Sequence, residues 1–241
     1  MSVTEKIERR IKKMSEGTTF RYQELSINQN EYPAAAKALE RLIKKGLISR
    51  ASTGLFYKPR QTAFGKLKPK EEELLKPFLF RDNRRVAYIT GTSLYNRLKL
   101  TTQVPKNIKL ATRDKRIVTK VGSLQVRSVK SYTDVTNDNY YLLELLDVLK
   151  DFKTIPDTDK NQTIKFMLQA IKKLTVKEVD KLIKVAILYP PRVRALLGAL
   201  LSKLNPGETY IELKKNINPL TEFTYGLTKE QLSTIENWNI N

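Results

Sequence analysis

The sequence predicts an α+β protein in three parts, on three observations. Apolar residues recur at helical spacing near both ends of the chain, and short apolar runs separated by turn residues lie between them. Apolar residues make up 40% of the 241 residues, which is enough to bury real cores. Residues 1–130 carry 30 basic and 11 acidic side chains, whereas residues 131–241 carry 15 and 14. We therefore expect a strongly basic front and a nearly neutral, mostly helical back.

The first part of the chain predicts helices followed by a β-hairpin. Apolar residues at helical spacing predict one helix over residues 3–14 and another over 31–45. Residues 18–26, between them, predict a brief strand that leads into a short helix. Two strand-like runs within residues 47–59 turn at Thr53-Gly54, which predicts a hairpin. This order of elements is that of a winged helix-turn-helix, in which the hairpin forms the wing.

Candidate binding residues follow from this placement. The second helix of a helix-turn-helix enters the major groove of DNA, where Asn and Gln bridge adenine and Arg bridges guanine. The candidates on this helix and its approach are Asn28, Gln29, Asn30, Tyr32, Lys37 and Arg41. The candidates on the wing, for phosphate or minor-groove contacts, are Arg50, Thr53, Lys58 and Arg60. The alternative for each set is an ordinary solvated polar surface.

The middle of the chain predicts a small α+β domain after a basic linker at residues 60–70. The expected elements are a helix over 70–80, a strand over 86–90, a helix over 91–98 and strands near 108–111, 116–121 and 124–129. The basic residues of this segment either extend a nucleic-acid footprint or form a solvated face, and the sequence leaves both open. They are Arg81, Arg84, Arg85, Arg97, Lys99, Lys106, Arg113, Lys115 and Arg116.

The last part of the chain predicts helices with no assigned role. They are expected over residues 139–152, 161–174, 176–188 and 191–204, with no assignment for the tail after Pro206. Tyr140 and Tyr141 fit the core of the first of these helices better than a base-stacking platform. The expected domains are a winged helix-turn-helix at 1–62, an α+β domain at 68–152 and a helical region at 153–241.

Composition restricts the function classes. A net charge of +20 favours polyanionic partners, above all nucleic acid. The chain has no Cys and no His, which excludes disulfides, zinc fingers, Cys–His pairs and Ser–His–Asp triads. We expect no metal and no cofactor. No apolar run reaches the ~20 residues of a membrane span and no signal-peptide pattern opens the chain. We therefore expect a cytoplasmic protein without a membrane partner.

An enzymatic role is not expected either. Asp157-x-Asp159 has the spacing of a paired-carboxylate metal site, as in nucleotidyltransferases. Such a site needs a phosphate-binding Gly-Ser turn shortly before it, and Gly122-Ser123 lies far upstream. Walker-type and G-x-G-x-x-G phosphate loops are absent from the sequence.

Several short motifs over roughly residues 5–130 resemble a known family. In the winged-helix region they are Ala38-Leu39-x-x-Leu42, Lys45-Gly46-Leu47-Ile48-x-Arg50 and Gly54-Leu55-Phe56-Tyr57-Lys58-Pro59. Beyond it they are Phe64-Gly65 with Pro69, Ile89-Thr90-Gly91, Asn96-x-Leu98-x-Leu100 and Thr102-Gln103-Val104-Pro105. Together they resemble the AbiEi-type antitoxins of type IV toxin–antitoxin systems, which serve in phage defence. The combination with the Thr102–Pro105 loop is the more specific part, although a fixed corner in the chain is the favoured role for that loop.

The resemblance implies a DNA-binding antitoxin. In that family the winged helix binds operator DNA and represses the antitoxin's own operon, and the following domain counters toxicity. The functional partner is a nucleotidyltransferase-like toxin that the antitoxin need not touch. The residues by themselves support only nucleic-acid binding, so an RNA-binding or nucleic-acid-processing module stays open as the alternative. The sequence leaves the operator sequence and the oligomeric state undetermined.

Overall fold

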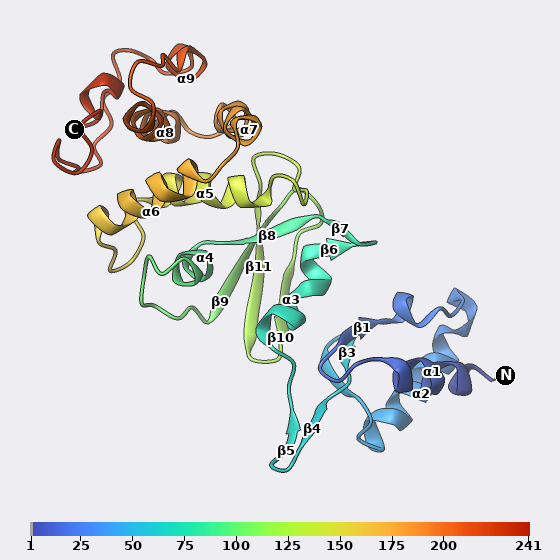
Figure 1. Cartoon of the computed structure of the whole chain (residues 1–241). Coiled ribbons are helices and arrows are strands. Elements are labelled where there is room, and N and C mark those ends of the chain that lie inside the picture. Colours follow the sequence, from blue (N-terminus) through green and yellow to red (C-terminus); the bar gives the residue numbers. More distant parts are fainter. Residues whose placement is uncertain (1) are drawn as a thin grey trace. The chain divides into compact units, whose positions relative to one another are not determined.

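The computed structural model of the chain describes residues 2–241 and has the predicted α+β architecture (Figure 1). The chain divides into two compact units. Unit 1 contains the residues up to Asn83 together with Val118–Val126, and unit 2 contains Arg84–Ile117 and Arg127–Asn241. This division differs from the three expected segments, because two parts of the expected middle domain pack with the winged helix.

Unit 1 contains the winged helix-turn-helix, which is confirmed. Its helices are α1 (Val3–Lys13), the 3-10 turns η1 (Tyr22–Leu25) and η2 (Gln29–Glu31), and α2 (Tyr32–Lys44). Its antiparallel sheet has the order β1 (Thr19–Arg21), β3 (Leu55–Tyr57) and β2 (Ser49–Ser52), with Phe20 opposite Phe56. Ile7 of α1, Leu39 of α2 and both phenylalanines are almost fully buried and hold the helices on the sheet.

Two further elements pack on the winged helix. Helix α3 (Glu71–Leu79) is fixed to β1, because the Thr19 amide donates to the Glu73 carboxylate at 3.2 Å and the Thr19 hydroxyl donates to the Glu73 carbonyl at 3.0 Å. The turn between β10 (Val118–Val121) and β11 (Leu124–Lys130) contacts the wing. There the Gly122 amide donates to the carbonyl of Ala51 at 3.1 Å, at the position where the β2–β3 register shifts. The bulge leaves the Ala51 carbonyl without a partner in the β2–β3 ladder, and the β10–β11 turn supplies the hydrogen bond instead.

The prediction of a linker at residues 60–70 is wrong. These residues form a second hairpin, β4 (Arg60–Thr62) and β5 (Gly65–Leu67), which Figure 1 shows extending from unit 1. The Ala63-Phe64 turn lacks the usual Asn-Gly signal, so the sequence pattern did not reveal it. The short strand β6 (Phe80–Arg81), also unpredicted, follows α3 in the same unit.

Unit 2 combines a small sheet with a helical core. Its strands are β7 (Arg84–Arg85), β8 (Ala87–Thr90), β9 (Asn107–Thr112) and the second half of β11. Strands β11, β9 and β8 are neighbours in this order in one sheet. Its helices are α4 (Thr92–Arg97), α5 (Tyr140–Asp151), α6 (Lys160–Lys172), α7 (Val176–Ala186), α8 (Pro191–Leu204) and α9 (Ile211–Lys215). One continuous core runs from Tyr88 to Ile240, so the boundary expected at 152/153 passes through packed side chains.

The acidic tail after Pro206, whose structure the residue pattern leaves unassigned, packs against α8. The six-membered ring of Trp238, in the 3-10 turn η3 (Glu236–Trp238), covers Gly198 of α8 so closely that a side chain at this position would clash with it. The Phe223 amide donates to the Asn239 carbonyl at 2.7 Å, which closes the tail into a loop. Among residues 2–241, every helix is too short or too polar to cross a lipid bilayer.

Candidate nucleic-acid interface

Helix α2 presents one basic face to solvent. Its opposite face is buried through Ala35, Leu39 and neighbouring apolar residues, which fixes the orientation of the helix on the sheet. Lys37, Arg41 and Lys44 are exposed on the other side, at successive helical turns. No ion pair joins any of these three cations to another described residue. Their charge therefore remains available to an anionic ligand.

The approach to α2 is ordered and polar. Asn28, Gln29 and Asn30 are exposed in and just before the turn η2. The backbone amide of Asn28 donates to the Glu31 carboxylate at 2.9 Å and so fixes this turn. This bond and the ammonium of Lys6 keep the pKa of Glu31 below its ordinary value. The negative charge of Glu31 is thus engaged within the protein. The exposed amide side chains in front of α2 lie where base-edge contacts are made in helix-turn-helix proteins.

Tyr32 and the wing residues have more varied environments. Tyr32 is half-buried against Tyr22, with ring centroids 5.6 Å apart, so it supports the turn as well as facing outward. Arg50 is exposed, with its guanidinium 5.6 Å from the centroid of the Phe56 ring. Thr53 is exposed at the tip of the wing. These positions leave Arg50 and Thr53 accessible for a phosphate or minor-groove contact.

Lys58 has a structural environment that the sequence did not reveal. Its ammonium donates to the carbonyls of Lys12 (3.1 Å) and Met14 (2.8 Å), at the C-terminal end of α1. These carbonyls have no partner within the helix, and a cation at a helix C-terminus also interacts favourably with the helix dipole. Lys58 therefore fastens the wing to α1, and a contact with a ligand is secondary at most.

Replacing Lys58 with Met is expected to lower the free energy of unfolding by about 1–2 kcal/mol, because two charge-assisted hydrogen bonds are lost. Urea denaturation followed by circular dichroism measures this change. Lys68→Met is the matched control, since Lys68 is exposed and no hydrogen bond or ion pair joins it to another described residue. Equal stability of the two variants would contradict the capping role.

The basic stretch continues beyond α2, and within it Lys45 pairs with Glu8 of α1 at 3.8 Å. Residues 41–70 contain nine Lys and Arg residues and no Asp or Glu. Arg60, Lys66 and Lys68 lie on the β4–β5 hairpin, and the ammonium of Lys66 donates to the carbonyl of Gly46 (2.7 Å), just after α2. Arg60 was predicted on the wing, but it lies on this separate hairpin, which the sequence pattern did not predict. The uninterrupted run of basic residues was the signal that would have pointed to it.

In unit 2, several of the predicted basic residues contact acidic or aromatic side chains of the protein itself. Arg97 pairs with Glu144 at 2.6 Å, Arg113 with Asp134 at 3.7 Å, and the Arg85 guanidinium lies 3.8 Å from the centroid of the Tyr140 ring. The residues Arg84, Lys99, Lys106, Lys115 and Arg116 of this unit are exposed, as is Arg81 in unit 1. Charge counts along the sequence overestimate the free positive charge here, because they do not show which cations are paired.

The two aspartates considered as a metal pair have structural roles. The Asp159 carboxylate accepts from the amides of Asn161 (2.7 Å) and Gln162 (3.2 Å) and so caps α6. The Asp157 carboxylate accepts from the Gln103 side chain at 3.2 Å, which ties the Thr102–Pro105 loop to the segment before α6. In the described part of the chain, no group of three or more acidic side chains is arranged to hold a metal ion.

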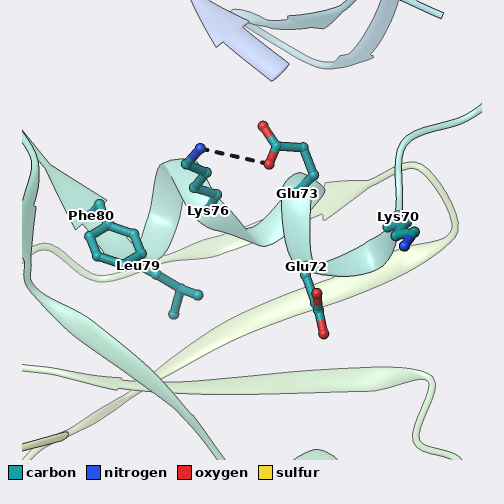
Figure 2. Close-up of a pocket in the computed structure, with 6 residues that line it drawn as sticks. All are labelled: Lys70, Glu72, Glu73, Lys76, Leu79 and Phe80. Carbon is teal, nitrogen blue, oxygen red and sulfur yellow. Dashed lines mark ion pairs between the residues drawn. The ribbon is translucent and has the colours of Figure 1, made fainter. Parts of the chain in front are cut away.

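A hollow of about 320 Å³ lies along α3 in unit 1 (Figure 2). Its lining consists of Lys70, Glu72, Glu73, Lys76, Leu79 and Phe80. Figure 2 shows Lys76 directed toward Glu73, with which it forms an ion pair at 3.8 Å. The carboxylates partly neutralise the lysines, so the hollow is a weaker candidate for an anion site than the face of α2.

Comparison with known proteins gives a family and a structural neighbour. A family model described as a family of unknown function, DUF6088, matches residues 6–140. A comparison with curated proteins gives no match. The crystal structure of the RV2827C protein from Mycobacterium tuberculosis is similar, with a TM-score of 0.53 and 10% sequence identity. The similarity covers 90% of this chain and 82% of that chain, and at this identity it shows a shared fold alone.

Proposed function

The chain belongs to DUF6088, a family of unknown function, and we propose that it is a DNA-binding antitoxin that represses its own operon. In this proposal α2 lies in the major groove of operator DNA and the wing contacts the adjoining backbone. The protein acts in the cytoplasm and counteracts a nucleotidyltransferase-like toxin. The antitoxin role depends on the sequence resemblance to AbiEi-type proteins, whereas DNA binding has its own support in the residues.

One observation carries the DNA-binding proposal: a winged helix-turn-helix whose outward helix face bears Lys37, Arg41 and Lys44 without ion pairs to the described residues. A structural helix in a protein needs no such row of cations, because their mutual repulsion is unfavourable unless an anion compensates it. Asn28–Asn30 supply hydrogen-bonding groups at the end of the helix that meets base edges. Phosphate contacts and base contacts are thus available from one surface.

An RNA-binding module is the weaker alternative. It was suggested by the basic middle segment, but Arg85, Arg97 and Arg113 in that segment contact groups of the protein itself. Recognition of single-stranded RNA also relies on exposed aromatic platforms. Tyr140 of unit 2 instead lies half-buried under Arg85.

The proposal is tested by fluorescence anisotropy with a labelled duplex that spans the region upstream of the chain's own start codon. We expect this duplex to bind at least ~1,000-fold more tightly than a scrambled duplex. The affinity should fall steeply as the salt concentration rises, because bound phosphates release counterions. A structured RNA of equal length is the comparison. Tighter binding of the RNA, or equal binding of the two duplexes, would reject a sequence-specific operator role.

A further inference from the structure

We propose that the β4–β5 hairpin is a second DNA-contacting element, and that Phe64 at its tip inserts between base pairs from the minor groove. The inference rests on the proposed DNA binding and goes beyond it. The side chain of Phe64 is 101% exposed, the largest value among the exposed large apolar side chains of the described residues. An aromatic ring held fully in water at the end of a hairpin has no packing role in the chain that presents it.

The hairpin is built to hold this ring in place. Strands β4 and β5 pair in register, with Arg60 opposite Leu67 and Thr62 opposite Gly65. The Thr62 hydroxyl donates to the Gly65 carbonyl at 2.7 Å and accepts from the Phe64 amide at 3.3 Å. Gly65 has a φ of +108°, which other residues rarely adopt, so the turn depends on glycine there. These contacts fix the backbone of the tip, and a fixed wedge loses little entropy on insertion.

The surroundings of Phe64 favour DNA as its ligand. Arg60 on β4 and Lys68, directly after β5, are exposed, and the nearest acidic residues along the chain are Glu40 and Glu71. Lys66 connects the hairpin to the end of α2 through the carbonyl of Gly46 (2.7 Å), so the hairpin adjoins the proposed recognition helix. Minor-groove proteins use the same combination, in which cations approach the backbone and an apolar side chain unstacks a base step.

The duplex described above and Phe64→Ala provide the test. Loss of the wedge should weaken binding about tenfold, the effect of one lost aromatic–base stack. The dependence of the affinity on salt should stay unchanged, because no charge is removed, whereas Lys68→Ala should reduce that dependence. Thymines that lose stacking react with permanganate, so one or two reactive thymines in the wild-type complex should become protected with Phe64→Ala. Phe64→Leu retains a wedge and should keep most of both effects.

A folding defect is not expected to complicate this experiment. Phe64 makes no buried contact, so its replacement should leave the midpoint of thermal unfolding unchanged. Leu220→Ala is the matched control, because Leu220 in unit 2 is 91% exposed. If the wild type binds the duplex and Phe64→Ala binds it equally with the same permanganate pattern, the wedge is rejected and the proposed function stands. If the wild type does not bind the duplex, both are rejected. Binding to phosphatidylserine vesicles that Phe64→Ala abolishes, with DNA binding unaltered, would assign the hairpin to membranes and reject the wedge.

Discussion

The double variant Lys37→Glu/Arg41→Glu is expected to bind the operator with an affinity at least about 100-fold lower at physiological salt. Each of the two exposed cations is expected to supply one phosphate or base contact, worth about 1–3 kcal/mol apiece. The reversed charges then add repulsion from the phosphates. The two side chains lie one helical turn apart on the exposed face of α2, so they reach the same groove. Anisotropy titrations at several salt concentrations measure both the affinity and its salt dependence.

The control for this variant is Lys165→Glu/Lys177→Glu, which changes the net charge by the same amount. Both lysines are exposed, on α6 and α7 of unit 2. If binding depended only on the overall charge of the protein, the two double variants would lose affinity equally. Retained binding by the α2 variant would show that α2 is not the recognition helix. Arg41→Ala alone should, in addition, relax the preference for one base in the operator.

Asp147→Ala is expected to destabilise unit 2 by about 3–5 kcal/mol, the cost of removing one partner of a buried ion pair. Asp147 is 1% exposed, and its carboxylate accepts from the hydroxyls of Tyr88 (2.9 Å) and Thr90 (2.5 Å) and from the ammonium of Lys150 (2.7 Å). The substitution leaves two buried hydroxyls and the half-buried ammonium of Lys150 without this acceptor. The effect is large beside a typical unfolding free energy of ~5–15 kcal/mol.

Differential scanning calorimetry should resolve this loss as a lower transition temperature. Asp180→Ala is the matched control, because Asp180 is an exposed aspartate on α7, in the same unit. A change of less than about 1 kcal/mol for Asp147→Ala would mean that water or another side chain replaces the carboxylate. The charged network would then contribute little to the fold.

The same network predicts how stability changes with pH. Burial alone would lower the pKa of Lys150, but the Asp147 carboxylate outweighs it, so the pKa lies above the ordinary value of 10.5. Burial, reinforced by Asp147, also raises the pKa of Tyr88. The folded state therefore retains protons that the unfolded state releases as the pH passes about 10, and stability falls from there upward. In Asp147→Ala this alkaline loss should be smaller.

Periodicity in the sequence was sufficient for most of the elements. The long helices and the β2–β3 wing were predicted because each buries one face against a core, which imposes a spacing that is visible in the residues. The β4–β5 hairpin was missed because it buries almost nothing. It is stabilised by hydrogen bonds within its own turn, and apolar spacing does not record these bonds.

The roles of individual polar residues depended on contacts between distant segments. Lys58 was predicted on the wing, but its ammonium is bound by carbonyls 44 and 46 positions earlier in the chain. Arg97 and Glu144, and likewise Gln103 and Asp157, are distant in the sequence and joined in the fold. A charge or an amide looks the same in a sequence whether it is paired or free.

By itself, the sequence determined the α+β class, the winged helix and the net positive charge, since these follow from the types and spacing of residues. The tertiary structure decided the domain division, because α3 and the β10–β11 turn pack on the winged helix while the helical tail completes the core of unit 2. It also decided which cations remain available to a ligand. The physical reason is that ion pairing and burial depend on which distant segments come into contact, and no local sequence pattern specifies those contacts.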